Sequence, residues 1–351
     1  MKEVSNTSKN ISGKREVAKR LIIISFLLSL VLVVIKFYAF YITSSNAILT
    51  DALESIINVF ATGFAFYSIY LSTLPKDTNH PYGHGKIEFF SAGFEGALII
   101  LAGVFIIYQS ILNLIEPEPL ENLPVGIFIV AFAAIINGYL GYILHKSGTE
   151  MDSFTLIADG KHLITDAISS FILLFGIAII HFTGYYILDS FISILFAFYI
   201  LFNGYSLIRM SVAGLMDESN PQAMGKVVAI LNANRKVNWI DVHNMRIQKY
   251  GPDIHIDCHL TLPFYYNLHK VHEELEELRK SLENNLDSNI EIFTHADPCI
   301  PGPCCNYCRV KGCAVRENPY KFDIDWNAEN LAKDQKHYHA LSKDKPKSIK
   351  K

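Results

Sequence analysis

The stretch MDSFTLIADGKHLITDAISSFILLFGIAIIHF, residues 151–182, decides the fold of this chain. It is long and apolar enough to cross a bilayer, yet its first half carries Asp159, His162 and Asp166. A charged side chain inside a membrane costs roughly 3 kcal/mol or more, so such residues usually serve a function. His162 and Asp166 are four residues apart, so a helix presents both on one face, where an imidazole and a carboxylate can bind one divalent cation.

A second apolar stretch, residues 46–71, contains the acidic residues Asp51 and Glu54. Two such stretches in one chain suggest a shared metal site inside the membrane. The alternative is a structural network of ion pairs, but acidic residues outnumber basic ones in these stretches. Asp159 lies nearer the end of its stretch, where a role at the membrane boundary and a role in guiding cations are both open.

Composition divides the chain into two halves. Half of the 351 residues (50%) are hydrophobic, and the apolar runs are concentrated before residue 210. This favours a membrane half followed by a soluble half. The net charge is -3, and Lys and Arg are scattered, which argues against a protein that binds nucleic acid. The first apolar run follows about twenty polar residues and is itself long enough to span, so we expect no cleavable signal peptide.

We expect six membrane spans, with both termini in the cytoplasm. The spans cover residues 21–41, 46–71, 89–115, 124–144, 152–182 and 186–208. Loops on one side of the membrane carry Lys76, Lys86 and Lys146, whereas the opposite loops carry no Lys or Arg. Basic loops face the cytoplasm, which sets the orientation. Glu95 and Asn137, in the third and fourth spans, either pair or serve an ion path, and we expect a packing role.

The chain changes character after Met216, where a soluble part begins. Helical patterns cover residues 221–234 and 267–286, and strand patterns cover 239–249, 253–262 and 290–293. This α-β-β-α-β order predicts a small two-layer α+β domain. We therefore divide the chain into a cytoplasmic tail (1–18), a six-helix membrane domain (19–212), a cytoplasmic domain (213–298), a cysteine-rich segment (299–313) and a polar tail (314–351).

Four motifs occur in order along these elements: LTDALES (49–55), HPYGHGKIE (80–88), DGKHLITD (159–166) and HADP (295–298). With these motifs, residues 15–298 resemble the cation diffusion facilitator family. The resemblance implies an α-helical bundle of six transmembrane helices with a C-terminal cytoplasmic α+β domain of the ferredoxin-like, metallochaperone type. It also implies a homodimeric, multi-pass transporter in the inner membrane of a prokaryote, which exports divalent transition-metal cations in exchange for protons.

The family's tetrahedral transport site takes a pair of ligands from each of two spans, and Asp51, His162 and Asp166 match three of its positions. The fourth position holds Ser55, a poor ligand. Water, the Ser55 hydroxyl or a shift to the Glu54 carboxylate can complete the site. We expect zinc or iron(II) as the cargo, with manganese, cobalt and cadmium as alternatives. The departure at Ser55 leaves the choice among them open, because a site richer in oxygen would favour iron or manganese over zinc.

The resemblance implies further metal sites in the soluble parts. A loop site matches Asp77, His80 and His84. The positions that match regulatory metal ligands across a dimer are His243, His259, His272, His295 and Asp297. A divalent metal, zinc or iron(II), is therefore expected both as the substrate and as a regulatory ion.

Five cysteines lie outside the resemblance. They are Cys299, Cys304, Cys305, Cys308 and Cys313. Disulfides are disfavoured in a reducing cytoplasm, so we expect these thiolates to bind metal. Redox chemistry at the C-x-x-C pair of Cys305 and Cys308 is an alternative.

Two other classes of function fit parts of the sequence. A membrane metalloenzyme would activate water on its metal and would use Glu54 as the base. A metal sensor would signal through its cytoplasmic domain to a partner. Neither explains acidic residues on two separate spans as simply as a transporter does, so we expect a transporter and not an enzyme.

Overall fold

The computed structural model describes residues 2–43, 46–115, 123–183, 186–250, 253–286 and 289–338. Within these ranges, the side chains of some helix residues, Asp51 and Glu54 among them, lie outside the description. The chain separates into two compact units, one within Ser12–Met216 and one within Asp217–Lys351. We describe each unit by itself, beginning with the helical one.

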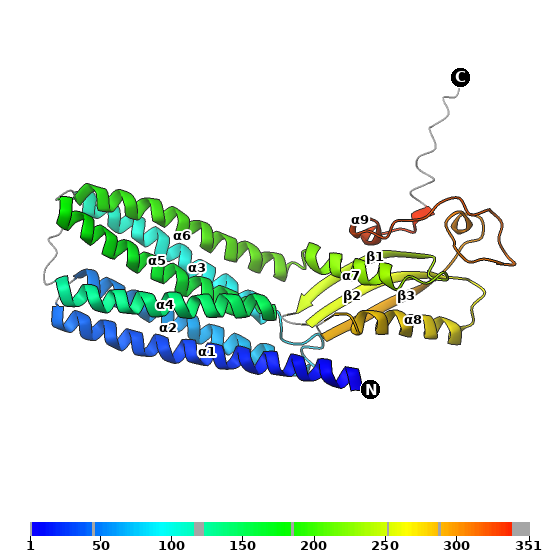
Figure 1. Cartoon of the computed structure of the whole chain (residues 1–351), viewed down its shortest axis with the longest axis horizontal. Helices are drawn as coiled ribbons and strands as arrows, with labels where there is room; N and C mark the ends of the chain where they lie inside the picture. The colour runs from blue at the N-terminus through cyan, green and yellow to red at the C-terminus, as the bar shows by residue number, and fades with distance from the viewer. Residues whose placement is uncertain are drawn as a thin grey trace, which may run out of the picture. The chain divides into compact units, whose positions relative to one another are not determined.

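The first unit consists of long helices that lie side by side (Figure 1). They are α1 (Lys2–Thr43), α2 (Asn46–Ser72), α3 (Ile87–Ile115), α4 (Leu123–Met151), α5 (Phe154–Thr183) and α6 (Tyr186–Leu215). Among the described residues, four segments are long and apolar enough to cross a membrane: Glu16–Ile42, Ile87–Leu112, Phe128–Met151 and Ser193–Leu215. They belong to α1, α3, α4 and α6, so the acid-bearing helices α2 and α5 are not among them.

Close packing between α4 and α5 fixes which face of α5 points inward. A Cβ atom placed on Gly141 of α4 would lie only 2.8 Å from the carbonyl oxygen of Gly160 on α5. Glycines at both positions therefore let the two backbones approach. At about 100° per residue, His162 and Asp166 lie roughly 200° and 240° around α5 from Gly160. They consequently point away from α4, toward the other helices of the unit.

Two helix boundaries differ from the expected ones. Helix α1 begins at Lys2, so most of the segment 1–18 that we expected as a tail is helical. Helix α4 continues to Met151, seven residues past the expected end of its span at 144. In both cases polar residues adjoin an apolar helix, and extending an existing helix requires no new nucleation, so the helix continues although several of these residues are Ser, Thr, Asn or Gly.

The second unit has the expected αββαβ order. Its elements are α7 (Pro221–Ala233), β1 (Asp241–Tyr250), β2 (Asp253–Leu262), α8 (Leu268–Glu283) and β3 (Asn289–Pro298). The sheet has the order β1-β2-β3, with β1 and β2 antiparallel and β2 and β3 parallel across the α8 crossover. Ile256 and Leu260 of β2 share one hydrophobic core with Val227 of α7 and Leu278 of α8. Two helices thus cover one face of the sheet, and the histidine-bearing positions fall on the other.

The described part of the segment after Cys313, which we expected as a polar tail, packs against the rest of the second unit. Ile324, Trp326 and Leu331 are buried in the core of the second unit, and a short helix, α9 (Ala328–Ala332), forms there. The Trp326 ring lies 4.2 Å from the guanidinium carbon of Arg235, in a cation–π contact. The average polarity of this segment conceals a few large apolar side chains, whose burial is enough to fix it. The Lys-rich run 343–351 lies outside the described residues.

Replacing Leu331 with Ala should destabilise this unit by about 2–5 kcal/mol, because the side chain is 0% exposed and its loss leaves a cavity. The two tryptophans of the chain, Trp239 and Trp326, both lie in this unit, so their fluorescence during chemical denaturation in detergent reports on it alone. Val315→Ala, at a position 38% exposed, is the matched control and should change the stability by less than about 0.5 kcal/mol. Equal free energies of unfolding for the two variants would contradict the burial of Leu331 in the core of the second unit.

Candidate functional site

Three polar residues of α5 are buried inside the helical unit. Asp159 is 0% exposed, His162 is 3% exposed and Asp166 is 7% exposed. His162 Nε2 lies 3.8 Å from Asp166 Oδ2, as expected for side chains one turn apart on one face. The imidazole and the carboxylate therefore point to the same region.

Asn58 of α2 joins these two side chains. Its amide nitrogen donates a hydrogen bond to Asp166 Oδ2, and its amide oxygen lies 2.9 Å from His162 Nε2. Since an amide oxygen accepts hydrogen bonds, this arrangement assigns a proton to Nε2 of His162. Asn58 is itself buried, at 5% exposure. The neutral amide of Asn58 thus links α2 to α5 and lies between the His162 imidazole and the Asp166 carboxylate, which are both potential metal ligands.

The sequence analysis did not single out Asn58. It lies seven residues after Asp51, about two turns along the same face of α2, and three residues after Ser55, about one turn. That spacing is the signal that could have found it. Ser55 is buried at 4% exposure and remains a candidate ligand. The side chains of Asp51 and Glu54 lie outside the described residues, so their places in the site stay predictions.

Asp159 occupies a separate position with partners of its own. Its two carboxylate oxygens accept hydrogen bonds from the hydroxyls of Ser25 (2.8 Å) on α1 and Thr62 (3.0 Å) on α2. A residue at the membrane boundary would have access to water, whereas Asp159 is fully buried. Of the two roles that the sequence left open for Asp159, the one at the membrane boundary does not fit this burial, because two hydroxyls take the place of water.

A second group of candidate ligands lies on the open face of the cytoplasmic sheet. His243, His259 and His295 are directly opposite one another on β1, β2 and β3, so their side chains share a face. Asp297 Oδ2 lies 3.2 Å from His243 Nε2 and 3.4 Å from His259 Nδ1. The ligand atoms of His243, His259 and Asp297 lie within 4.8 Å of one another, close enough to hold one metal ion.

The charge states in this group suit a metal ligand set. Burial lowers the pKa of His243 and keeps its imidazole neutral. Burial raises the pKa of Asp297, but Lys336, His259 and His243 outweigh that effect, so its pKa is lowered and the carboxylate is ionised. Lys336 Nζ lies 3.6 Å from Asp297 Oδ2. The Lys336 ammonium therefore contacts the Asp297 carboxylate that a metal ion would bind, and the two cations would compete for it.

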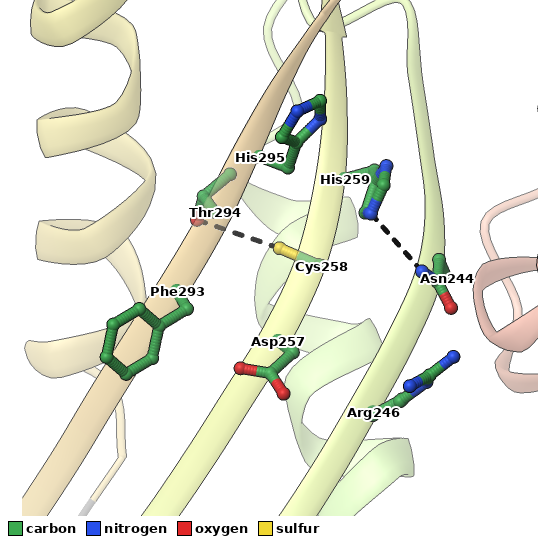
Figure 2. Close-up of a pocket in the computed structure, with 8 residues that line it drawn as sticks. All are labelled: Asn244, Arg246, Asp257, Cys258, His259, Phe293, Thr294 and His295. Carbon is green, nitrogen blue, oxygen red and sulfur yellow. Dashed lines mark hydrogen bonds between the residues drawn. The ribbon is translucent and has the colours of Figure 1, made fainter.

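A hollow of about 350 Å³ adjoins this group on the same face (Figure 2). His259 and His295 stand at one end of it, and Asn244 Nδ2 lies 3.2 Å from His259 Nε2. His295 is outside the three-residue group, but its Nδ1 lies 3.1 Å from Asp297 Oδ1, which can accept a hydrogen bond from it. His272, which was expected to bind metal across a dimer, is exposed on α8 and does not join the group among the described residues of this single chain, so its role as a ligand stays a prediction. The strand register brings the other histidines together and leaves a helix residue apart.

The loop between α2 and α3 gathers its three expected ligands. Asp77 Oδ1 lies 3.1 Å from His80 Nδ1, and Asp77 Oδ2 lies 3.3 Å from His84 Nε2. Their ligand atoms lie within 4.8 Å of one another. A hydrogen bond from the backbone N–H of His80 lowers the pKa of Asp77, which favours its ionised, metal-binding form.

Comparison with known proteins agrees with both units. Residues 22–216 match the model of the cation efflux transmembrane domain, and residues 221–299 match that of the cytoplasmic domain of cation efflux proteins. The uncharacterized transporter sll1263 of Synechocystis sp. is 31% identical over 264 residues, which cover 75% of this chain and 85% of the relative. The chain belongs to the cation diffusion facilitator family.

Two more distant relatives carry functional names. The manganese efflux system protein MneP of Bacillus subtilis is 26% identical over 298 residues, which are 82% of this chain and 98% of the relative. The cation-efflux pump FieF of Salmonella arizonae is 25% identical over 277 residues, which are 79% and 91%. As a cation diffusion facilitator, this chain is an integral membrane transporter that exports divalent metal cations, and it is not an enzyme.

The five cysteines from Cys299 onward lie at or beyond the end of the matched region of this cation diffusion facilitator. Cys304, Cys305 and Cys308 are buried, and Cys304 and Cys308 pack in the hydrophobic core. Burial raises the pKa of both thiols, so they favour the protonated form, which binds metal poorly. Among the described residues, no three cysteines bring their sulfur atoms within 4.8 Å of one another. Metal binding by Cys299, Cys304, Cys305, Cys308 and Cys313 stays a prediction.

Asn58→Ala should weaken cation binding in the helical unit by about 10–100-fold, because it removes a group that positions two ligands. Asn58→Asp should retain binding, since it keeps an oxygen at the same place. The measurement is calorimetry with manganese(II) and zinc(II) on the detergent-solubilised protein. A background carrying His84→Ala and His243→Ala removes the loop and sheet sites from the signal. Native affinity in the alanine variant would show that the amide has no part in the site.

Lys336→Ala should tighten cation binding at the sheet group by about fivefold, because the ammonium no longer competes for Asp297. Lys333→Ala is the matched control, since the Lys333 side chain contacts Glu329 and Asn330 instead. Calorimetry in a background of His84→Ala and His162→Asn isolates this site. Unchanged metal affinity in Lys336→Ala would show that Lys336 does not compete with the metal ion for Asp297.

Proposed function

We propose that this cation diffusion facilitator is a secondary active transporter that exports a divalent transition-metal cation from the cytoplasm in exchange for protons. The observation that carries the proposal is the buried cluster in which Asn58 of α2 bridges His162 and Asp166 of α5. Ligands contributed by two separate helices can be rearranged when those helices move. Such movement can open the site to each side of the membrane in turn.

In the proposed site, His162 and Asp166 bind the cation together with Asp51 of α2. One oxygen completes the set, from Asn58, Ser55, Glu54 or water. When the cation arrives, Asn58 gives up its hydrogen bonds to His162 and Asp166, and its amide oxygen becomes available as a ligand. His162 must then carry its proton on Nδ1, an atom that is buried and has no partner among the described residues.

The donor set is one nitrogen with several oxygens and no sulfur. Such a set suits zinc, iron(II) and manganese(II), and zinc and iron(II) are the cargoes expected from the sequence. The amide oxygen of Asn58 makes the site harder, which within this group favours iron(II) or manganese(II). The relative MneP is named for manganese efflux, which agrees with that preference.

Protons drive release because they compete with the cation for the same atoms. An imidazolium has no free lone pair and a carboxylic acid binds metal weakly, so protonation of His162 and Asp166 expels the cation. Deprotonation on the cytoplasmic side restores the site. In this proposal all of the helices α1–α6 span the inner membrane of a prokaryote, with both termini in the cytoplasm.

The cytoplasmic unit serves regulation in a homodimer. Two copies pair through this unit, and a cation at His243, His259 and Asp297 stabilises the paired state. The cytoplasmic metal concentration then shifts the population toward the transporting conformation. His295, which contacts Asp297, can contribute a further ligand. A protein that only senses metal would bind cations here without moving them.

His162→Asn should lower metal flux into everted vesicles or proteoliposomes at least about 100-fold under a pH gradient, because a ligand is lost. His145→Asn is the matched control: His145 lies on α4, outside the cluster with Asn58 and Asp166, and its replacement should leave the flux within about twofold. Zinc, iron(II), manganese(II) and cobalt(II) are compared in parallel. Undiminished flux in His162→Asn, or binding without any flux in the native protein, would contradict the proposed transporter.

A further inference from the structure

Glu95 on α3 is a buried acid that the proposed site does not use. It is 0% exposed, and neither of its carboxylate oxygens has a hydrogen-bond partner among the residues that the structure describes. Pairing with Asn137, one of the roles open from the sequence, is therefore not formed within the described part of the chain. Ser91, one turn earlier on α3, is also 0% exposed, and its hydroxyl has no partner in the same part. An ionised carboxylate without any donor is strongly disfavoured in such surroundings.

A second buried acid, Asp159 on α5, acts electrostatically on Glu95. The two acids have different surroundings. Asp159 accepts hydrogen bonds from Ser25 at 2.8 Å and Thr62 at 3.0 Å, and such donors stabilise its anion. Glu95 has no described donor that could do the same. If one of the two carries the negative charge, the hydrogen bonds select Asp159.

The charges on the neighbouring helices do not neutralise Glu95. Helix α3 packs against α2, α5 and α6. From α5 the charged group that acts on Glu95 is Asp159, and α2 contributes the neutral hydroxyl of Thr62 to the same region. The basic residue described on α6, Arg209, is exposed. Two interacting negative charges in a medium of low dielectric cannot both persist while no cation is bound nearby, so one acid is then neutral.

We propose that Glu95 holds a proton as a neutral carboxylic acid and gives it up during the transport cycle, as a proton site separate from the metal ligands His162 and Asp166. This inference rests on the proposed function, since it assigns one of the exchanged protons. A proton needs a single oxygen, whereas a hard metal ion such as magnesium or manganese collects about six oxygen ligands. The hydroxyls of Ser25 and Thr62 already point their protons at Asp159, which leaves too few free oxygens for such an ion.

Asp159 couples this proton to the metal site. It lies three residues before His162 on α5, about 4.5 Å along the helix axis, and the two side chains interact electrostatically. A divalent cation at His162 and Asp166 therefore makes a proton on Glu95 less favourable. The O–H bond of Glu95 breaks, and the proton leaves to water, directly or by way of the Asp159 carboxylate, while the charge of the bound cation offsets the second anion. Linkage is reciprocal, so a proton returning to Glu95 weakens metal binding in turn.

The test uses the full-length protein in proteoliposomes with a pH-sensitive dye inside, and follows zinc(II) or manganese(II) and protons together. Glu95→Gln imitates the protonated acid but cannot release a proton. We expect its metal affinity to stay within about threefold of native, the number of protons exchanged per cation to fall by about one, and flux driven by the pH gradient to drop at least about tenfold. Glu88→Gln is the matched control, because the Glu88 carboxylate on the same helix is bonded to Ser153 at 2.7 Å. Its proton-to-metal ratio should equal that of the native protein.

The outcomes separate this inference from the proposed function. A native protein that moves metal without protons would refute the antiport and the Glu95 proton together. Native antiport with an unchanged proton-to-metal ratio in Glu95→Gln would refute the Glu95 proton alone. A variant that binds one cation fewer would show that the acid pair holds a metal ion, which also overturns the proposal. Glu95→Asp, which keeps an acid, should restore part of the coupling.

Discussion

The cost of burying charge away from water is the constraint on which the membrane unit depends. Every ionisable group inside the helical bundle needs a donor, an opposite charge or a proton. In this protein the side-chain amide of Asn58 meets that need for His162 and Asp166 at once, since it donates to one and accepts from the other. A neutral amide can do this in the absence of a cation, and it can move aside without leaving a net charge behind.

This constraint explains which part of the site could be read from the sequence. Acids in an apolar stretch are conspicuous because they are costly, so the spacing of His162 and Asp166 was enough to place them together. Asn58 carries no charge and produces no such signal, although it forms the bond between the two helices. Ser25 and Thr62 escaped notice for the same reason, since hydroxyls are common in helices and become meaningful only when an acid such as Asp159 lies beside them.

The soluble unit shows a different limit. Strand alternation and the αββαβ order predicted its fold, and the strand register follows from them because residues directly opposite share a face. That register gathers His243, His259 and His295 on one sheet face, whereas His272 lies on α8, a distinction that a set of histidines alone does not contain. The segment 314–338 was misjudged because its mean composition is polar, while its position is fixed by a few buried side chains such as Trp326 and Leu331. Burial is a property of individual residues, and an average over a segment hides it.

A common device links the sites of this cation diffusion facilitator. At each one, a hydrogen-bond donor, an ammonium group or a proton of the protein stabilises an acid when no metal ion is bound. The amide of Asn58 bonds to Asp166, the ammonium of Lys336 lies against Asp297, and the proton that we assign to Glu95 neutralises one of two close carboxylates. A metal ion at Asp297 must displace the Lys336 ammonium, so part of its interaction energy is offset by the contact that is lost. In the membrane unit, Asn58 exchanges its hydrogen bonds for a place beside the ion, and the Glu95 proton acts on the metal site only through charge. Transport needs a cargo that can leave, and these groups limit affinity without removing ligands. The same groups keep the acids satisfied when no metal is present, which lets the empty carrier persist in the membrane and return for another ion.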